Sequence, residues 1–75
     1  MLELTLATLL STMSEDFCVL MEKNDDIVKS TLLAYSEANK KYGPENVIDI
    51  INQASPLEIR TIAVSSVVTK CPNKL

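Results

Sequence analysis

The chain has 75 residues, of which 47% are hydrophobic and 23% are charged, and its formal net charge is −3. This length and composition predict one domain with a small hydrophobic core, and they argue against a disordered chain. One glycine and three prolines supply too few turns for a fold rich in β-hairpins. We therefore expect a single all-α domain over residues 1–75.

An apolar stripe over the first 21 residues predicts a long first helix from about Glu3 to Glu22. At about 100° per residue, its members fall within a sector roughly 120° wide. Ser14 followed by Glu15 resembles a new N-cap, so a kink near residues 11–14 is the alternative. The stripe stays in phase across this point, which favours one helix. Its members are Leu2, Leu6, Leu9, Leu10, Met13, Phe17, Leu20 and Met21.

A second helix is expected to follow Asp25 or Asp26, either of which can cap it, and to run to about Lys41. Gly43 is the only glycine and stands where a left-handed C-terminal cap is expected. Val28 lies at the margin of the apolar face of this helix. The face itself is expected to comprise Ile27, Thr31, Ala34, Tyr35, Ala38 and Tyr42.

Two further helices are expected, the third over Pro44–Gln53 and the fourth over Pro56–Lys70. Proline is favoured in the first turn of a helix, where its missing N–H costs nothing. Ser55 and Glu58 have the spacing of a capping box around the start of the fourth helix. These signals predict a short connection between the two helices.

The fourth helix is apolar on more than one side and has no charge between Arg60 and Lys70. A helix that is apolar all round is normally buried on several sides. Its β-branched residues leave a strand as the alternative, although one strand without a partner cannot satisfy its backbone. We expect a compact four-helix bundle with a long N-terminal helix and a largely buried C-terminal helix.

Two sets of small or apolar residues exceed what one short chain is expected to cover. The first lies on a narrow second face of the first helix, where small side chains would let another helix approach closely. The second lies on the fourth helix. A solvated face is the alternative for the first set. The predicted interface comprises Leu4, Ala7, Ser11, Cys18, Ile59, Ile62 and Ala63.

The sequence offers little for catalysis or for a cofactor. It has no histidine and no glycine-rich phosphate loop, and Cys18 and Cys71 fit no metal-binding spacing. Cys18 is expected to act as a small apolar residue, with a bridge to Cys71 as the alternative. We expect a non-enzymatic protein with no cofactor, metal, membrane or small-molecule substrate, in the cytoplasm.

The size, acidity and four expected helices resemble those of acyl carrier proteins. That family carries its prosthetic group on the serine of an Asp-Ser-Leu motif, and neither Ser30 nor Ser36 lies in such a motif. The resemblance is one of composition, and no carrier function follows from it.

Binding of another protein, or of a second copy as a homodimer, is therefore the expected role. We interpret the chain as an accessory factor, inhibitor or adaptor of bacterial or phage type. The alternative is a dimeric helix-turn-helix-like DNA-binding regulator with a basic patch from Lys40, Lys41, Arg60 and Lys70. The acidic net charge argues against nucleic acid, because neutralised phosphates supply much of its binding energy.

Overall fold

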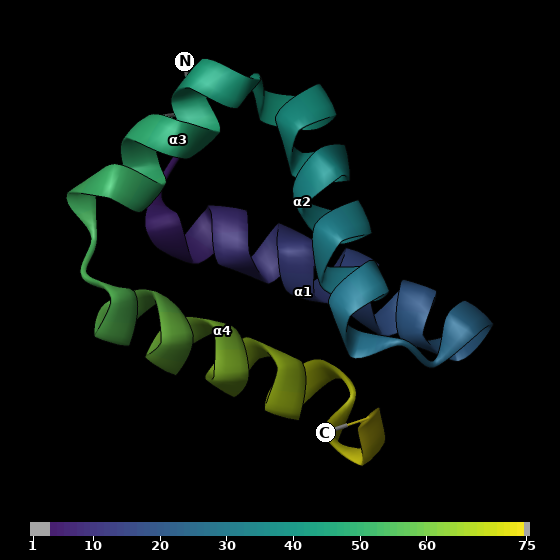
Figure 1. The fold of residues 1–75 in the computed structure, drawn as a ribbon. Helices are drawn as coiled ribbons and strands as arrows, with labels where there is room; N and C mark the ends of the chain where they lie inside the picture. The colour runs from purple at the N-terminus through teal and green to yellow at the C-terminus, as the bar shows by residue number, and fades with distance from the viewer. Residues whose placement is uncertain (1–3, 75) are drawn as a thin grey trace.

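The computed structural model describes residues 4–74. Four helices follow one another, α1 (Leu6–Asn24), α2 (Ile27–Tyr42), α3 (Pro44–Gln53) and α4 (Pro56–Lys70), and a short 3-10 turn covers Pro72–Lys74. No β-strand occurs within residues 4–74, so the all-α prediction is confirmed and the strand alternative for the last helix is wrong. In Figure 1, α1 forms the floor, with α2 and α4 on its two sides and α3 joining them at one end.

The first helix begins later than expected because Thr5 caps it. The Thr5 hydroxyl oxygen accepts a hydrogen bond from the backbone N–H of Thr8 at 3.2 Å, and the helix starts at Leu6 rather than at Glu3. Glu3 and Leu2, the first member of the predicted stripe, lie outside the described residues.

The expectation of one uninterrupted first helix is confirmed. Ser14 is buried and does not cap a new helix, because its hydroxyl donates to the Leu10 carbonyl at 2.7 Å, one turn back in the same helix. From the stripe, Leu9, Leu10, Phe17 and Met21 are buried.

Polar side chains fix the turn between α1 and α2. The Asn24 side-chain oxygen accepts from the Asp26 backbone N–H at 2.8 Å and from the Ser30 hydroxyl at 3.1 Å. Asp25 adopts a left-handed conformation with φ 55°, and Asp26 caps α2 by accepting from the Lys29 backbone N–H. Of the two candidate caps, Asp26 is the one used.

The remaining boundaries follow the local signals of the sequence. Gly43 has φ 91°, a region that favours glycine, and its N–H donates to the Asn39 carbonyl at the end of α2. Its ψ of 133° differs from that of a left-handed cap. The Ser55 hydroxyl accepts from the Glu58 backbone N–H at 3.1 Å, which confirms the predicted cap of α4.

The core consists of two clusters along α1. The first cluster joins the N-terminal half of α1 to α2 and α3 through Leu9, Ala38 and Val47, which are all 0% exposed. The second cluster joins the C-terminal half of α1 to α2 and to the end of α4. Its members are Phe17, Met21, Ala34, Val67 and Cys71.

The prediction of a largely buried C-terminal helix is wrong. Val67 is the buried residue of α4, whereas Leu57 is 73% exposed and both Val64 and Val68 are almost half exposed. The reason is geometric, because α4 packs chiefly on α1 and makes no substantial contact with α2. One neighbour cannot cover a helix that is apolar all round.

The predicted face of α2 is also partly wrong. Ala34 and Ala38 are buried as expected, but Ile27 and Thr31 are exposed and Ser30 is buried instead. Small residues at these three buried positions let α1 approach closely, and the hydroxyl of Ser30 is satisfied by Asn24 of α1.

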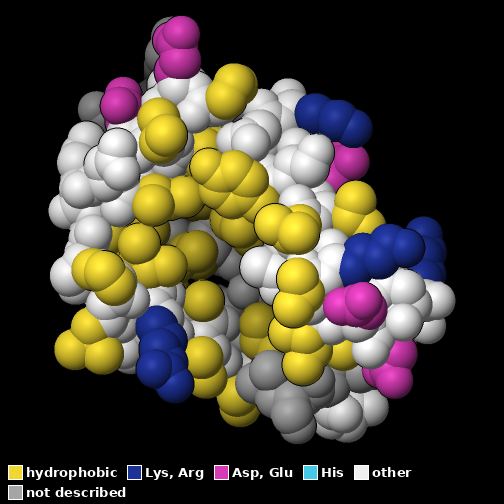
Figure 2. Space-filling view, viewed as in Figure 1, with side chains coloured by type: hydrophobic (Ala, Val, Ile, Leu, Met, Phe, Trp, Pro, Cys, Tyr) yellow, Lys and Arg dark blue, Asp and Glu magenta, His cyan; other side chains and the backbone are white. Residues whose placement is uncertain are grey.

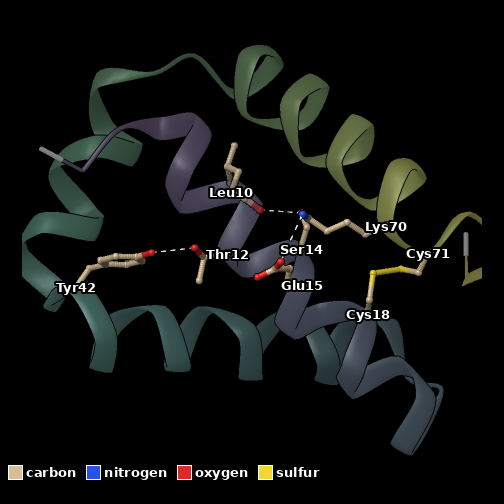
Figure 3. A network of polar contacts seen from close by, with 8 residues as sticks. All are labelled: Leu10, Thr12, Ser14, Glu15, Cys18, Tyr42, Lys70 and Cys71. Carbon is tan, nitrogen blue, oxygen red and sulfur yellow. Dashed lines mark hydrogen bonds and ion pairs between the residues drawn. A yellow bond between two sulfur atoms is a disulfide. The ribbon is translucent and has the colours of Figure 1, made fainter. Parts of the chain in front are cut away.

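A disulfide joins Cys18 of α1 to Cys71 at the end of α4, with 5.9 Å between the Cα atoms (Figure 3). The treatment of Cys18 as an unbridged apolar residue is therefore wrong. Beside the disulfide, the Lys70 ammonium lies 3.8 Å from the Glu15 carboxylate. Disulfides are rare in cytosolic proteins, and the expected cytoplasmic location stays a prediction.

Candidate functional site

An apolar groove opens between α2 and α4, with α1 as its floor. Its volume is about 200 Å³. Figure 2, viewed as Figure 1, shows hydrophobic side chains lining the hollow and continuing onto its rims. The lining residues are Leu10, Met13, Ser14, Phe17, Ile27, Thr31, Ala34, Ala63, Val64 and Val67.

The groove is lined by residues that recur at helical spacing on α1, α2 and α4. Leu10, Met13 and Phe17 recur every three or four residues on α1 and form the floor. Ile27 begins one wall at the first turn of α2, and Val64 stands in the other wall on α4. The walls stay apart because α2 and α4 each pack on α1 rather than on one another.

The two hydroxyl groups in the lining are already satisfied within their own helices. Ser14 donates to the carbonyl of Leu10, and Thr31 donates to the carbonyl of Ile27, each at 2.7 Å. Neither hydroxyl hydrogen is available to a bound molecule. The groove is therefore suited to apolar side chains, which need no directional hydrogen bonds.

The rims carry exposed apolar residues that extend the surface beyond the groove itself. Val28 of α2 is 68% exposed, and Leu57 and Val68 of α4 are exposed as well. Single exposed apolar residues are ordinary, whereas a contiguous patch commonly marks an interaction surface. The groove and its rims, which we call the groove face, meet that description.

Charge is sparse on the groove face and differs between its ends. Arg60 precedes Val64 by one helical turn and so lies on the groove side of α4, toward its beginning. Asp25 and Asp26 directly precede Ile27 at the other end. The groove face therefore has a positive end and a negative end.

The interface residues predicted on the first helix do not form one open surface, and Leu4 lies before the start of α1. Leu4 packs against the cluster shared with α3, Ala7 is exposed, Ser11 is half-buried, and Cys18 is held in the disulfide. The disulfide and the pairing of Glu15 with Lys70 place the C-terminal part of this line against α4 of the same chain.

On α4, the predicted residues Ile59, Ile62 and Ala63 are each half-buried. Ala63 lines the groove, whereas Ile62 borders a shallow hydroxyl-rich depression on α4 that also involves Thr61 and Ser65. Their contact with another protein stays a prediction. Val64 lines the groove as well and is not among the predicted interface residues, although the all-round apolar character of α4 indicates more than one apolar face.

The four cations proposed for a DNA-binding patch are dispersed. Lys70 pairs with Glu15, and Lys40 pairs with Glu37 at 3.4 Å. Figure 1 places the ends of α2 and α4, where these lysines lie, on opposite sides of the molecule. No observation on the described residues favours the nucleic-acid alternative.

Within the described part of the chain, His, Cys, Asp and Glu residues form no group of three or more that could hold a metal ion. Among the same residues, no helix combines the length and the apolar character needed to cross a bilayer. Comparison of the chain with protein-family models, curated protein sequences and solved structures gave no match.

Proposed function

We propose that the chain is a small non-enzymatic binding factor that acts as an accessory protein, inhibitor or adaptor of bacterial or phage type. It binds a macromolecular partner of protein nature, and it self-associates as a homo-oligomer. The groove face is the surface through which it binds. The observation that carries this proposal is the open apolar groove whose rims are also apolar.

The physical support is the cost of leaving this surface in water. Each fully buried aliphatic side chain contributes about 1.5–3 kcal/mol, and Leu57, Val64 and Val68 remain exposed on one helix. Covering them by a protein surface would recover part of that free energy. The satisfied hydroxyls of the lining add no polar group that would need a matching partner.

The test introduces a charge into the groove face. Val64→Asp is expected to abolish association, because an aspartate in an apolar contact must lose its hydration. Val19→Asp is the matched control, since Val19 is 55% exposed, against 46% for Val64, and does not line the groove. Sedimentation velocity and affinity capture with each variant as bait measure self-association and partner binding.

The proposal requires that Val19→Asp behaves like the parent chain while Val64→Asp loses both kinds of binding. Circular dichroism must show equal helix content in the two variants. Equal association and equal capture by Val64→Asp and Val19→Asp would contradict the groove face as the binding surface.

A further inference from the structure

We infer that the groove face docks against the groove face of a second copy of this chain, in a two-fold pair in which Arg60 of each copy faces Asp25 of the other. This inference rests on the proposed function and names the partner that covers its surface.

The shape of the groove face allows such self-pairing. The groove is concave, and the exposed residues Leu57, Val64 and Val68 follow helical spacing along one side of α4, where Val64 is part of the groove wall. Figure 2 shows that the hollow and its apolar rims lie on the same side of the molecule. In a two-fold pair each patch meets the same patch of its partner, so one association covers the groove together with these exposed residues of α4.

The hydroxyl groups that line the groove cannot donate hydrogen bonds to a second copy. The relative orientation of the two copies must therefore be determined by charged residues. Ser14 and Thr31 use their hydroxyl hydrogens within their own helices. On α4, the groove side carries one charged residue, Arg60, between Leu57 and Val68. A partner with an acidic group opposite Arg60 is therefore favoured over a wholly apolar one.

The second copy supplies that acidic group. α1 and α4 run in the same direction, because Glu15 pairs with Lys70 and Cys18 is bonded to Cys71. Asp25 follows α1 and so lies at the end of the groove where α4 finishes, whereas Arg60 lies toward the end where α4 begins. A two-fold axis that crosses the centre of the groove at right angles to its length brings the positive end of each copy to the negative end of the other.

Both charges are available for this contact. Within residues 4–74, neither Arg60 nor Asp25 forms an ion pair, and both residues are exposed. Asp26 is less suited, because its carboxylate already caps α2. A helix from another protein, or an apolar small molecule, would have no reason to require Asp25.

The experiment uses two charge-reversed variants, Arg60→Glu and Asp25→Lys. Each variant alone places like charges at both contacts of the pair, so its dimer dissociation constant should rise by about tenfold or more. In an equimolar mixture, a heterodimer has opposite charges at both contacts, and the affinity of the parent chain should return. Sedimentation equilibrium gives the affinities, and native mass spectrometry identifies the heterodimer.

Matched controls carry the same charge changes elsewhere. Lys29→Glu alters the far side of α2, and Asp49→Lys alters α3, and both sites are exposed. These variants should dimerise like the parent chain, and their mixture should show no preference for the heterodimer. Circular dichroism verifies that every variant keeps its helices, including Asp25→Lys with its left-handed residue.

Two results would overturn the inference. If both charge-reversed variants dimerise with the parent affinity, Arg60 and Asp25 do not orient the pair and the inference is wrong, whereas the proposed function survives as long as Val64→Asp still abolishes association. If the parent chain is monomeric at 0.5 mM (a ceiling of roughly 4.5 kcal/mol of association free energy), the groove face does not take a second copy. The self-association in the proposed function then fails as well, and its second part, the binding of another protein, fails only if Val64→Asp captures the same proteins as Val19→Asp.

Discussion

The two halves of α1 are covered in different ways. Around the N-terminal half, α2 and α3 close a cluster in which Leu9, Ala38 and Val47 have no exposed surface. Around the C-terminal half, α4 contributes Val67 to the core and is held by a disulfide and one ion pair. Side-chain packing joins the N-terminal half of α1 to its neighbours, whereas a disulfide joins the C-terminal half to the end of α4.

This difference explains why the groove can exist. A domain of this size gains little stability from its core alone, and small proteins often add a disulfide. Because Cys18–Cys71 keeps α4 beside α1, the apolar residues of α4 need not be buried within the chain. They remain available for the surface that we propose as a binding face.

Removing the disulfide should cause the largest loss in the free energy of unfolding. It closes a loop across a sequence separation of 53, for which the chain-entropy model gives about 4 kcal/mol. The double variant Cys18→Ser/Cys71→Ser is expected to lose roughly that much free energy of unfolding in a denaturant titration. Hydrogen exchange should accelerate in α4 more than in α1, α2 and α3. Unchanged protection of α4 amides would show that packing, and not the disulfide, holds this helix.

Truncating Leu9 in the cluster that α1 shares with α2 and α3 should lower the free energy of unfolding nearly as much. Leu9→Ala removes a side chain with no exposed surface and should lower the free energy of unfolding by about 3 kcal/mol. Leu57→Ala, at a position that is 73% exposed, should change it by less than about 0.5 kcal/mol in the monomer. Thermal unfolding at low protein concentration compares the two variants. Similar losses in both would mean that α4 is packed as well as the cluster around Leu9.

Removing the cap of α4 should lower the free energy of unfolding by less than the disulfide or Leu9 substitutions do. Ser55→Ala deletes the hydroxyl that accepts from the Glu58 N–H and should cost about 1 kcal/mol. The conservative variant Ser55→Thr keeps an acceptor and should lose less. Denaturant titrations of the two variants give the difference, and equal losses would show that the hydroxyl contributes nothing to the start of α4.

Helix boundaries were predictable because neighbours in sequence determine them. Ser55 and Pro56 mark the start of α4, Asp26 marks the start of α2, and Gly43 separates α2 from α3. Each signal depends on hydrogen bonds or backbone angles within about four residues.

Packing between helices was less predictable because it depends on which helices meet. The sequence shows that α4 is apolar all round but not that α1 is its main neighbour, so the burial of this helix was overestimated. Likewise, Ser30 is buried because Asn24 accepts its hydroxyl, a contact that the apolar periodicity of α2 does not indicate. The Cys18–Cys71 bond joins residues 53 apart, beyond the reach of any local pattern.

The most direct test of the groove face is a search for intermolecular contacts at Val64. Nuclear Overhauser effects are measured in an equimolar mixture of isotope-labelled and unlabelled chains, at a concentration where sedimentation shows the dimer. We predict intermolecular effects between the methyl groups of Val64 or Val68 and those of Ile27 or Leu57 of the other copy. A dimer in which these methyl groups show contacts within one chain alone would contradict the account.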